Sequence, residues 1–208
     1  MKLENPLPTK PFRNRRARLA RSLGHGVVVL STAPERARNA DSHYDYRWDS
    51  GFYYLTGFRE PEAVLVMTLG RKPRSILFCR EKNAEREIWD GFRYGPALAR
   101  EMFGFDEAYC TAELDTRMPE LIANQEVLHT PVGSDAAWDA RVAGWLNAVR
   151  AKVRTGVTAP VEIRDVRAAA NDMRLVKDDH ELAIMRRAAA ISSAARRRSI
   201  RATWSGQA

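Results

Sequence analysis

Three runs of hydrophobic residues along the chain follow a strand-like pattern. The β-branched run Gly26–Ser31, which Pro34 follows closely, predicts a central strand buried on both faces. Ala63–Leu69 and Ser75–Cys79 are two further apolar runs, and the short stretch between them is rich in turn-forming residues. This pair predicts a β-hairpin next to the central strand.

Helical spacing dominates much of the remaining chain. Apolar residues within 10–23 predict a first, basic helix, and Gly24 lies where a left-handed C-terminal glycine is favoured. The same reasoning predicts helices at 96–103, 113–122, 136–153 and 165–173, with short strands at 107–110 and 126–130. Strands and helices therefore alternate, which predicts an α/β fold.

A long amphipathic helix is predicted to begin near Asp179. Asp178 and Glu181 have the spacing of a capping box, and apolar residues recur at helical intervals after them. Beyond Ile191, however, Ile200 and Trp204 are the large apolar residues that remain. We expect this helix to dock on a partner that the chain itself does not supply.

Two stretches show no clear periodicity. Residues 35–58 are polar and aromatic, which predicts a long ordered loop of the kind that often carries function. Residues 87–95 combine aromatic and charged side chains with glycine, a composition that suits either a contact loop or an ordinary packed loop.

The formal charge of +8 and the pI of about 9.9 raise the question of nucleic-acid binding. Arginines gather near both ends of the chain, and charges between them are mixed. Because both clusters lie on predicted helices, we interpret them as solvated helix faces and expect no nucleic-acid partner. The clusters are formed by Arg13, Arg15, Arg16, Arg18, Arg21, Arg186, Arg187, Arg196, Arg197, Arg198 and Arg201.

Neither membrane insertion nor secretion is indicated. The apolar runs are far shorter than the roughly 20 residues that cross a bilayer. Met1–Pro8 lacks the apolar core of a signal peptide, so we expect a cytoplasmic protein. Cys79 and Cys110 form no paired motif and are expected to be reduced and buried.

Asp41, His43 and Asp45 alternate as metal ligands can, within an otherwise polar stretch. The stretch lacks the glycine and distal glutamate of a calcium loop, and Arg47 would compete for its carboxylates. We therefore assign no metal site to this chain. The histidines fit no recognisable catalytic signature, and no glycine-rich phosphate loop follows the central strand.

Three blocks of sequence, taken together, resemble the aminopeptidase P (Xaa-Pro aminopeptidase) family. They occur in the family's order, and the second block is far more specific than a generic loop followed by a strand. The blocks are Asn39–Ser42 with Tyr44, Tyr46 and Arg47; Phe52–Phe58 with Glu60–Leu65; and Met173–Lys177 with Glu181 and Met185–Ala188.

The resemblance implies a mixed β-sheet flanked by helices, of the type found at the amino terminus of creatinase and prolidase. It implies that 1–172 form this domain, and that 173–208 form a linker and the first helix of a pita-bread catalytic domain, truncated here. In the family, two divalent metals, usually Mn²⁺, are held by two aspartates, a histidine and two glutamates of that catalytic domain. We therefore expect no cofactor in this chain.

The function implied is that of a non-catalytic domain for assembly and substrate gating, inactive alone. The parent enzyme releases an N-terminal residue preceding proline, and it is expected to form a homo-oligomer. Asp41 is the expected contact for a substrate ammonium group, and Trp89 the expected wall against a proline ring. Alternatives are a stand-alone interaction module, a basic domain that binds polyanions, and a prolidase or creatinase relative.

Overall fold

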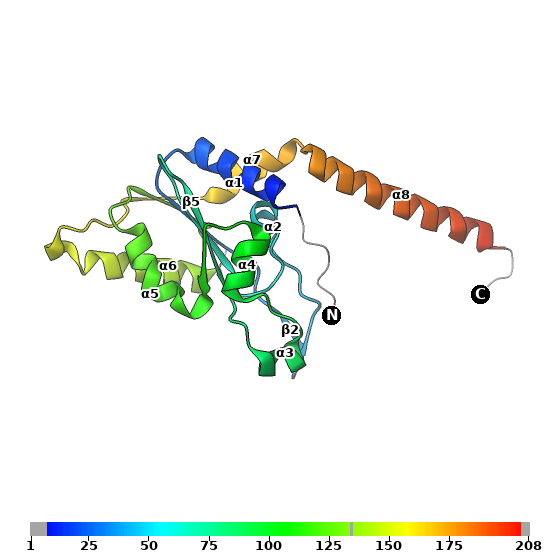
Figure 1. The fold of residues 1–208 in the computed structure, drawn as a ribbon, viewed down its shortest axis with the longest axis horizontal. Helices are drawn as coiled ribbons and strands as arrows, with labels where there is room; N and C mark the ends of the chain where they lie inside the picture. Colours follow the sequence, from blue (N-terminus) through cyan, green and yellow to red (C-terminus); the bar gives the residue numbers. More distant parts are fainter. Residues whose placement is uncertain (1–7, 134, 205–208) are drawn as a thin grey trace. The chain divides into compact units, whose positions relative to one another are not determined.

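The strand-like runs of the sequence assemble into one mixed sheet in the computed structural model, which describes residues 8–133 and 135–204. Its strands lie in the order β6-β5-β4-β1-β7-β8 (Figure 1). β4 runs antiparallel to its neighbours β1 and β5, whereas the other pairs are parallel. The strands are β1 (Val27–Ser31), β4 (Val64–Thr68), β5 (Arg74–Cys79), β6 (Glu107–Cys110), β7 (Val127–His129) and β8 (Glu162–Arg164).

The expected α/β fold with a mixed sheet flanked by helices is therefore confirmed. The central strand β1 and the β4–β5 hairpin lie where the sequence places them. The predicted helices correspond to α1 (Thr9–Leu23), α4 (Gly95–Phe103), α5 (Leu114–Ile122), α6 (Ala136–Arg150), α7 (Val166–Leu175) and α8 (Asp179–Ala202). β8 was not predicted, because its three residues are exposed and lack strand-like alternation.

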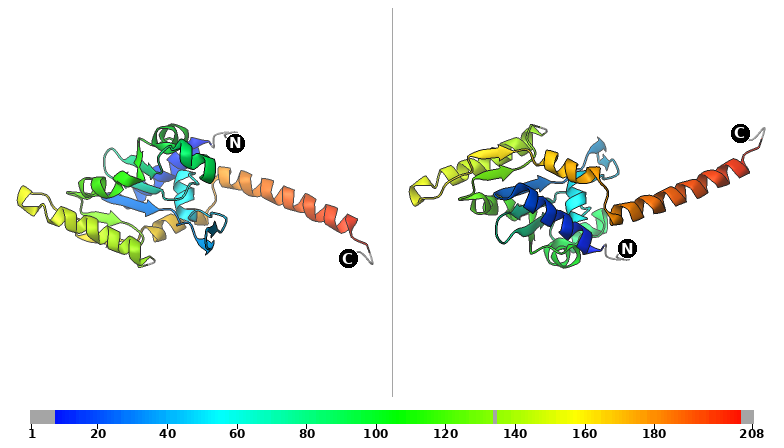
Figure 2. Two further views of the ribbon diagram at one scale, coloured as in Figure 1. Left: turned by 90° about the horizontal axis from the view of Figure 1, so that it is seen from below. Right: turned by 90° about the horizontal axis from the view of Figure 1, so that it is seen from above.

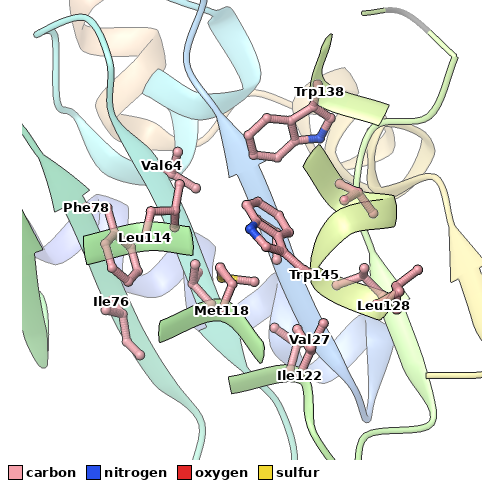
Figure 3. Close-up of a cluster of buried hydrophobic side chains, with 14 of the residues drawn as sticks. Val27, Val64, Ile76, Phe78, Leu114, Met118, Ile122, Leu128, Trp138 and Trp145 are labelled. Atoms are coloured by element: carbon pink, nitrogen blue, oxygen red, sulfur yellow. The ribbon is translucent and has the colours of Figure 1, made fainter. Parts of the chain in front are cut away.

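Alternation along the strands divides the core between two faces of the sheet. Val27 and Phe78 pack on one face, where Leu114 of α5 and Trp145 of α6 cover them (Figure 3). Their neighbours in the strands, such as the buried Val28, point to the opposite face. Figure 2 shows α1 on that opposite face and α6 on the first. Helices therefore bury both faces of the sheet.

The prediction of a long loop at residues 35–58 is wrong in detail. This stretch contains a small hairpin, β2 (Ala37–Asn39) with β3 (Ser42–His43), followed by a helix, α2 (Ser50–Thr56). The side chain of Asp49 caps α2 by accepting a hydrogen bond from the Phe52 amide at 2.7 Å. Tertiary packing makes this segment helical. Most of α2 is buried, so its sequence lacks the alternation of apolar and polar faces that predicts a helix.

The loop expected at 87–95 is also partly helical. α3 (Ala84–Asp90) begins after Asn83, whose side chain accepts a hydrogen bond from the Arg86 amide at 3.0 Å. No residue of α3 is buried, so the helix carries no apolar stripe that sequence reasoning could detect.

Arg15 and Arg16 contradict the expectation that the first arginine cluster is a solvated face. Both are buried, and their guanidinium groups bind carbonyl oxygens of Tyr54 and Leu55 in the last turn of α2. Arg16 also donates to the Gly104 carbonyl at 2.7 Å. Its burial lowers the guanidinium pKa to about 10. The two arginines thus satisfy carbonyls that a helix end leaves without partners.

Both cysteines are free thiols, as expected, but their burial differs. Cys79 is fully buried, and this burial raises the pKa of its thiol to about 12. The prediction that Cys110 is buried is wrong, because that residue is only partly buried at the edge strand β6.

The chain divides into two compact units, Met1–Asn171 and Asp172–Ala208. The second unit contains α8, whose predicted capping box is present: Asp178 Oδ1 accepts from the Glu181 amide at 2.9 Å, and Glu181 Oε2 accepts from the Asp178 amide at 3.1 Å. Ile184, Met185 and Ile191 of α8 are exposed. None of the described helices is long and apolar enough to cross a membrane.

Arg16→Ala should lower the free energy of unfolding by about 2–4 kcal/mol, because the buried Leu55 carbonyl and the partly buried Gly104 carbonyl lose their donor. Arg18→Ala is the matched control on the same helix: Arg18 is exposed, and its loss should change stability by less than about 0.5 kcal/mol. Urea unfolding of both variants measures the difference. Equal stabilities for the two variants would show that the buried guanidinium does not support α2.

Candidate functional site

The loops at one edge of the sheet hold the residues singled out from the sequence. β1, β5, β6, β7 and β8 run parallel to one another, so their carboxyl ends meet at the same edge. In open α/β sheets, ligands bind outside this carboxyl edge. The β2–β3 hairpin follows β1 there, and α3 follows β5.

Asp41 lies in the turn of the β2–β3 hairpin, which we call the hairpin arm (37–43). The turn contains Ala40 at a φ of 36°, and every residue of both short strands is exposed. Asp41 itself is exposed, so its carboxylate is open to a ligand from solvent. The described residues contain no group of three His, Cys, Asp or Glu side chains that could hold a metal ion.

Trp89 lies on α3, which we call the helix arm (84–90). Its side chain is 85% exposed, and the adjacent Ile88 is 77% exposed. Two neighbouring large apolar side chains at this exposure, on a helix that buries nothing of its own, are typical of a contact surface.

The structure does not bring the two arms together. In Figure 1, β2 and α3 both project past the same end of the sheet. Figure 2, turned by 90°, separates the β2–β3 hairpin from α3 across the width of that end. Asp41 and Trp89 therefore flank the carboxyl edge from two sides rather than forming one cluster.

The helix arm is attached to the sheet through Glu60. This buried carboxylate accepts a hydrogen bond from the Tyr94 amide, N to Oε1, at 2.7 Å. Burial raises the pKa of Glu60, and the Tyr94 hydrogen bond with the nearby cations Arg80 and Arg93 opposes that rise. Sequence reasoning placed Glu60 in a family block without a role. Arg59 and Glu62 are charged as well, so the local sequence does not distinguish Glu60 as the buried carboxylate.

Ion pairs reinforce the base of the helix arm. Lys82 Nζ pairs with Glu87 Oε1 at 2.6 Å and also donates to the Arg93 carbonyl at 2.9 Å. Arg93 pairs with Asp90 at 2.6 Å. Polar contacts therefore join the residues before and after the helix arm, although the helix itself buries no side chain.

Not every polar atom near Glu60 is satisfied by the protein. Among the described residues, Glu60 Oε2, Arg80 Nε and Arg93 Nε are buried and have no hydrogen-bond partner. Such atoms bind solvent or a ligand when they can, because leaving them unpaired costs about 1–3 kcal/mol each.

The base of the hairpin arm is held by Tyr46. Its hydroxyl lies 2.8 Å from the Thr32 hydroxyl and donates to the Ala33 carbonyl at 2.9 Å, just after β1. Burial raises the pKa of this phenol. Both arms are thus fixed at the carboxyl edge by one polar residue each, the buried Glu60 and the partly buried Tyr46.

Comparison with known proteins identifies the family of this chain. The model of the aminopeptidase P N-terminal domain family matches residues 12–129. The chain belongs to this family. It is 36% identical over 192 residues to the Xaa-Pro aminopeptidase of Escherichia coli (strain K12), covering 91% of this chain and 44% of the relative. The Xaa-Pro aminopeptidase of Haemophilus influenzae is 30% identical over 190 residues, covering 90% and 41%.

Solved structures agree with the sequence comparison. Zn-substituted aminopeptidase P from E. coli, in complex with product, superposes with a TM-score of 0.91 at 34% identity, covering 98% of this chain and 47% of that one. The Asp260Ala form of the same enzyme gives the same values. The chain therefore has the fold of the amino-terminal region of aminopeptidase P and spans less than half the length of these relatives.

Glu60→Gln should change how stability depends on pH. The variant keeps an oxygen for the Tyr94 amide and loses the charge. Because the folded pKa of Glu60 is raised above the ordinary value of 4.5, the folded wild type binds more protons than the unfolded chain and loses stability as the pH rises from 4.5 through that raised pKa. The variant lacks this loss, so its free energy of unfolding should gain on wild type over that window.

Urea unfolding at a series of pH values measures this difference. Glu101→Gln, at an exposed position of α4, is the control and should follow wild type within about 0.5 kcal/mol throughout. A Glu60→Gln variant that instead loses ground as the pH rises would contradict the assigned burial of this carboxylate.

Proposed function

We propose that this chain is the non-catalytic assembly and substrate-gating domain of a Mn-dependent Xaa-Pro aminopeptidase, an enzyme that releases an N-terminal residue preceding proline. The observation that carries the proposal is Trp89, which is 85% exposed on an arm fixed through a buried carboxylate. An exposed indole on a helix that is fixed in place becomes buried only when another surface packs against it. A catalytic cleft that receives proline peptides is such a surface.

Asp41 supplies the complementary polar contact. Its exposed carboxylate in the turn of the hairpin arm is suited to attract the ammonium group of a peptide that enters the cleft. Trp89, on the other side of the edge, offers a flat apolar wall for a proline ring. The two arms would thus approach a peptide from opposite sides.

Hydrolysis itself is assigned to the part of the enzyme that lies outside this sequence. A dinuclear metal site lowers the pKa of bound water and polarises the scissile carbonyl. The described residues do not fit the two Mn²⁺ ions, since no three of their His, Cys, Asp or Glu side chains converge. Accordingly, no catalytic step is assigned to this chain, and its partner is the metal-binding catalytic domain, within a cytoplasmic homo-oligomer.

A second candidate function is polyanion binding by α8. Arg196, Arg197, Arg198 and Arg201 are all exposed on this helix, which gives a dense cationic surface. Phosphate binding would weaken steeply with salt, so a titration of duplex DNA at several salt concentrations separates this function from gating.

The gating role of Trp89 can be tested in a fusion. Residues 1–172 replace the matching region of the E. coli Xaa-Pro aminopeptidase, and hydrolysis of an Xaa-Pro peptide is measured. Trp89→Ala should lower kcat/KM about tenfold, because one apolar contact to the substrate is worth about 1–3 kcal/mol. Trp89→Phe should retain most of the activity.

In the isolated chain, Trp89→Ala should change the free energy of unfolding by less than about 0.5 kcal/mol, which separates an effect on gating from an effect on folding. Unchanged kinetics would overturn the role.

Asp41→Asn in the same fusion should raise KM several-fold, with little change in kcat, because a long-range attraction to the substrate ammonium is lost. Asp45→Asn is the matched control, since Asp45 is also exposed and only four residues away. The effect of Asp41→Asn should shrink at high salt. Equal KM values for the two variants would remove Asp41 from the proposed site.

A further inference from the structure

A groove at the carboxyl edge of the sheet lies apart from Asp41 and Trp89, and neither residue lines it. Its volume is about 500 Å³, and it lies between the end of β1, the start of β4 and the first turn of α6. Small apolar residues and the Trp138 side chain form much of its wall, including Ala33, Ala63 and Val64. Volumes of roughly 300–1,000 Å³ are typical of ligand sites.

The wall of the groove is held firmly. Asp135 caps α6 by accepting from the Ala137 amide at 2.9 Å and the Trp138 amide at 3.1 Å. The Trp138 indole donates to the Thr130 hydroxyl at 3.0 Å. On the opposite side, the Thr111 hydroxyl donates to the Glu62 carbonyl at 2.8 Å. The groove therefore exists before any ligand arrives.

The charge around the groove is opposite in sign to that of the protein. The lining includes the exposed carboxylates of Glu35, Glu62 and Asp135. Arg141 is the cation of the lining, and Asp115 neutralises it through two hydrogen bonds of 2.7 and 3.1 Å. An acidic rim over an apolar wall, on a chain of net charge +8, selects an occupant that is cationic and partly apolar.

We propose that the groove binds a basic side chain and its apolar neighbour in an extended peptide. The assignment of a peptide as the occupant rests on the proposed function, because the groove opens at the same edge of the sheet as the two arms. Glu35 lies just before the hairpin arm in sequence, so a peptide held by its amino end near the arms has this groove within reach. The inference extends the substrate class to proline peptides that carry arginine or lysine downstream.

The direct test uses the 208-residue chain and a capped tripeptide, acetyl-Leu-Arg-Leu amide. Capping removes the terminal ammonium, so that Asp41 is not probed. Titration followed by two-dimensional NMR of the amide groups should show saturable shifts at Ala137 and Trp138. The same peptide with glutamine in place of arginine should bind about fivefold or more weakly, and the glutamate version should not bind.

Two kinds of variant assign the binding to the groove. Glu35→Gln combined with Glu62→Gln removes rim charges at exposed positions and should weaken binding of the arginine peptide about fivefold or more. Ala137→Leu, at an exposed position of the first turn of α6, should fill the groove and abolish binding. Glu101→Gln combined with Glu120→Gln is the charge-matched control outside the groove and should bind like wild type.

Several outcomes overturn the inference. These are no saturable binding, equal affinity for the arginine and glutamate peptides, or shifts that avoid the groove. Self-association that perturbs the groove residues without any peptide would assign the surface to a second copy instead. Binding by the isolated chain does not depend on Asp41 or Trp89, so the groove and the gating role can fail separately.

Discussion

The arms at the carboxyl edge bury almost no apolar surface of their own, so polar contacts at their bases must hold them in place. No residue of α3 is buried, and both strands of the hairpin arm are exposed. The buried Glu60 carboxylate accepts a hydrogen bond from the Tyr94 amide and so fixes one arm, and the Tyr46 hydroxyl fixes the other. Hydrogen bonds with a charged partner are stronger and more directional than neutral ones, which suits this task.

The Glu60 anchor follows α2 in the chain and depends on the two arginines that bind the last turn of that helix. Arg15 and Arg16 bind the last carbonyls of α2, and the chain leaves that helix through Gly57 towards Glu60. Gly57 has a φ of 71°, and a Cβ atom there would approach the Phe12 ring to 2.8 Å. Gly57 has a backbone conformation that is open mainly to glycine. Together with the two buried guanidinium groups, it sets the direction in which the chain brings Glu60 to the edge of the sheet.

Regular apolar spacing was enough to predict every strand of the sheet except β8, and most of the helices. β1 and the β4–β5 hairpin have long apolar runs, and α8 has a capping box, so local signals and packing agree. α2 and α3 were missed for opposite reasons: α2 is mostly buried and α3 is not buried at all, so neither shows one apolar face. Asp49 and Asn83 as N-caps were the signals that could have revealed them.

The candidate site was less accessible to sequence reasoning. Asp41 and Trp89 are candidates through the family resemblance, and both are exposed, each on its own arm. The burial of Glu60, Arg15 and Arg16 is a property of tertiary contacts between segments far apart in sequence. The acidic groove joins residues from β1, β4 and α6 and leaves no local pattern.

The central claim is that this chain shapes access to a metal-dependent cleft and performs no hydrolysis itself. The most direct test incubates the purified 208-residue chain with Mn²⁺ and an Xaa-Pro peptide, and follows release of the N-terminal residue. We expect no release above the buffer blank, and we expect release to be restored when residues 1–172 are fused to the remaining part of the E. coli enzyme. Mn²⁺-dependent turnover by the chain alone would contradict it.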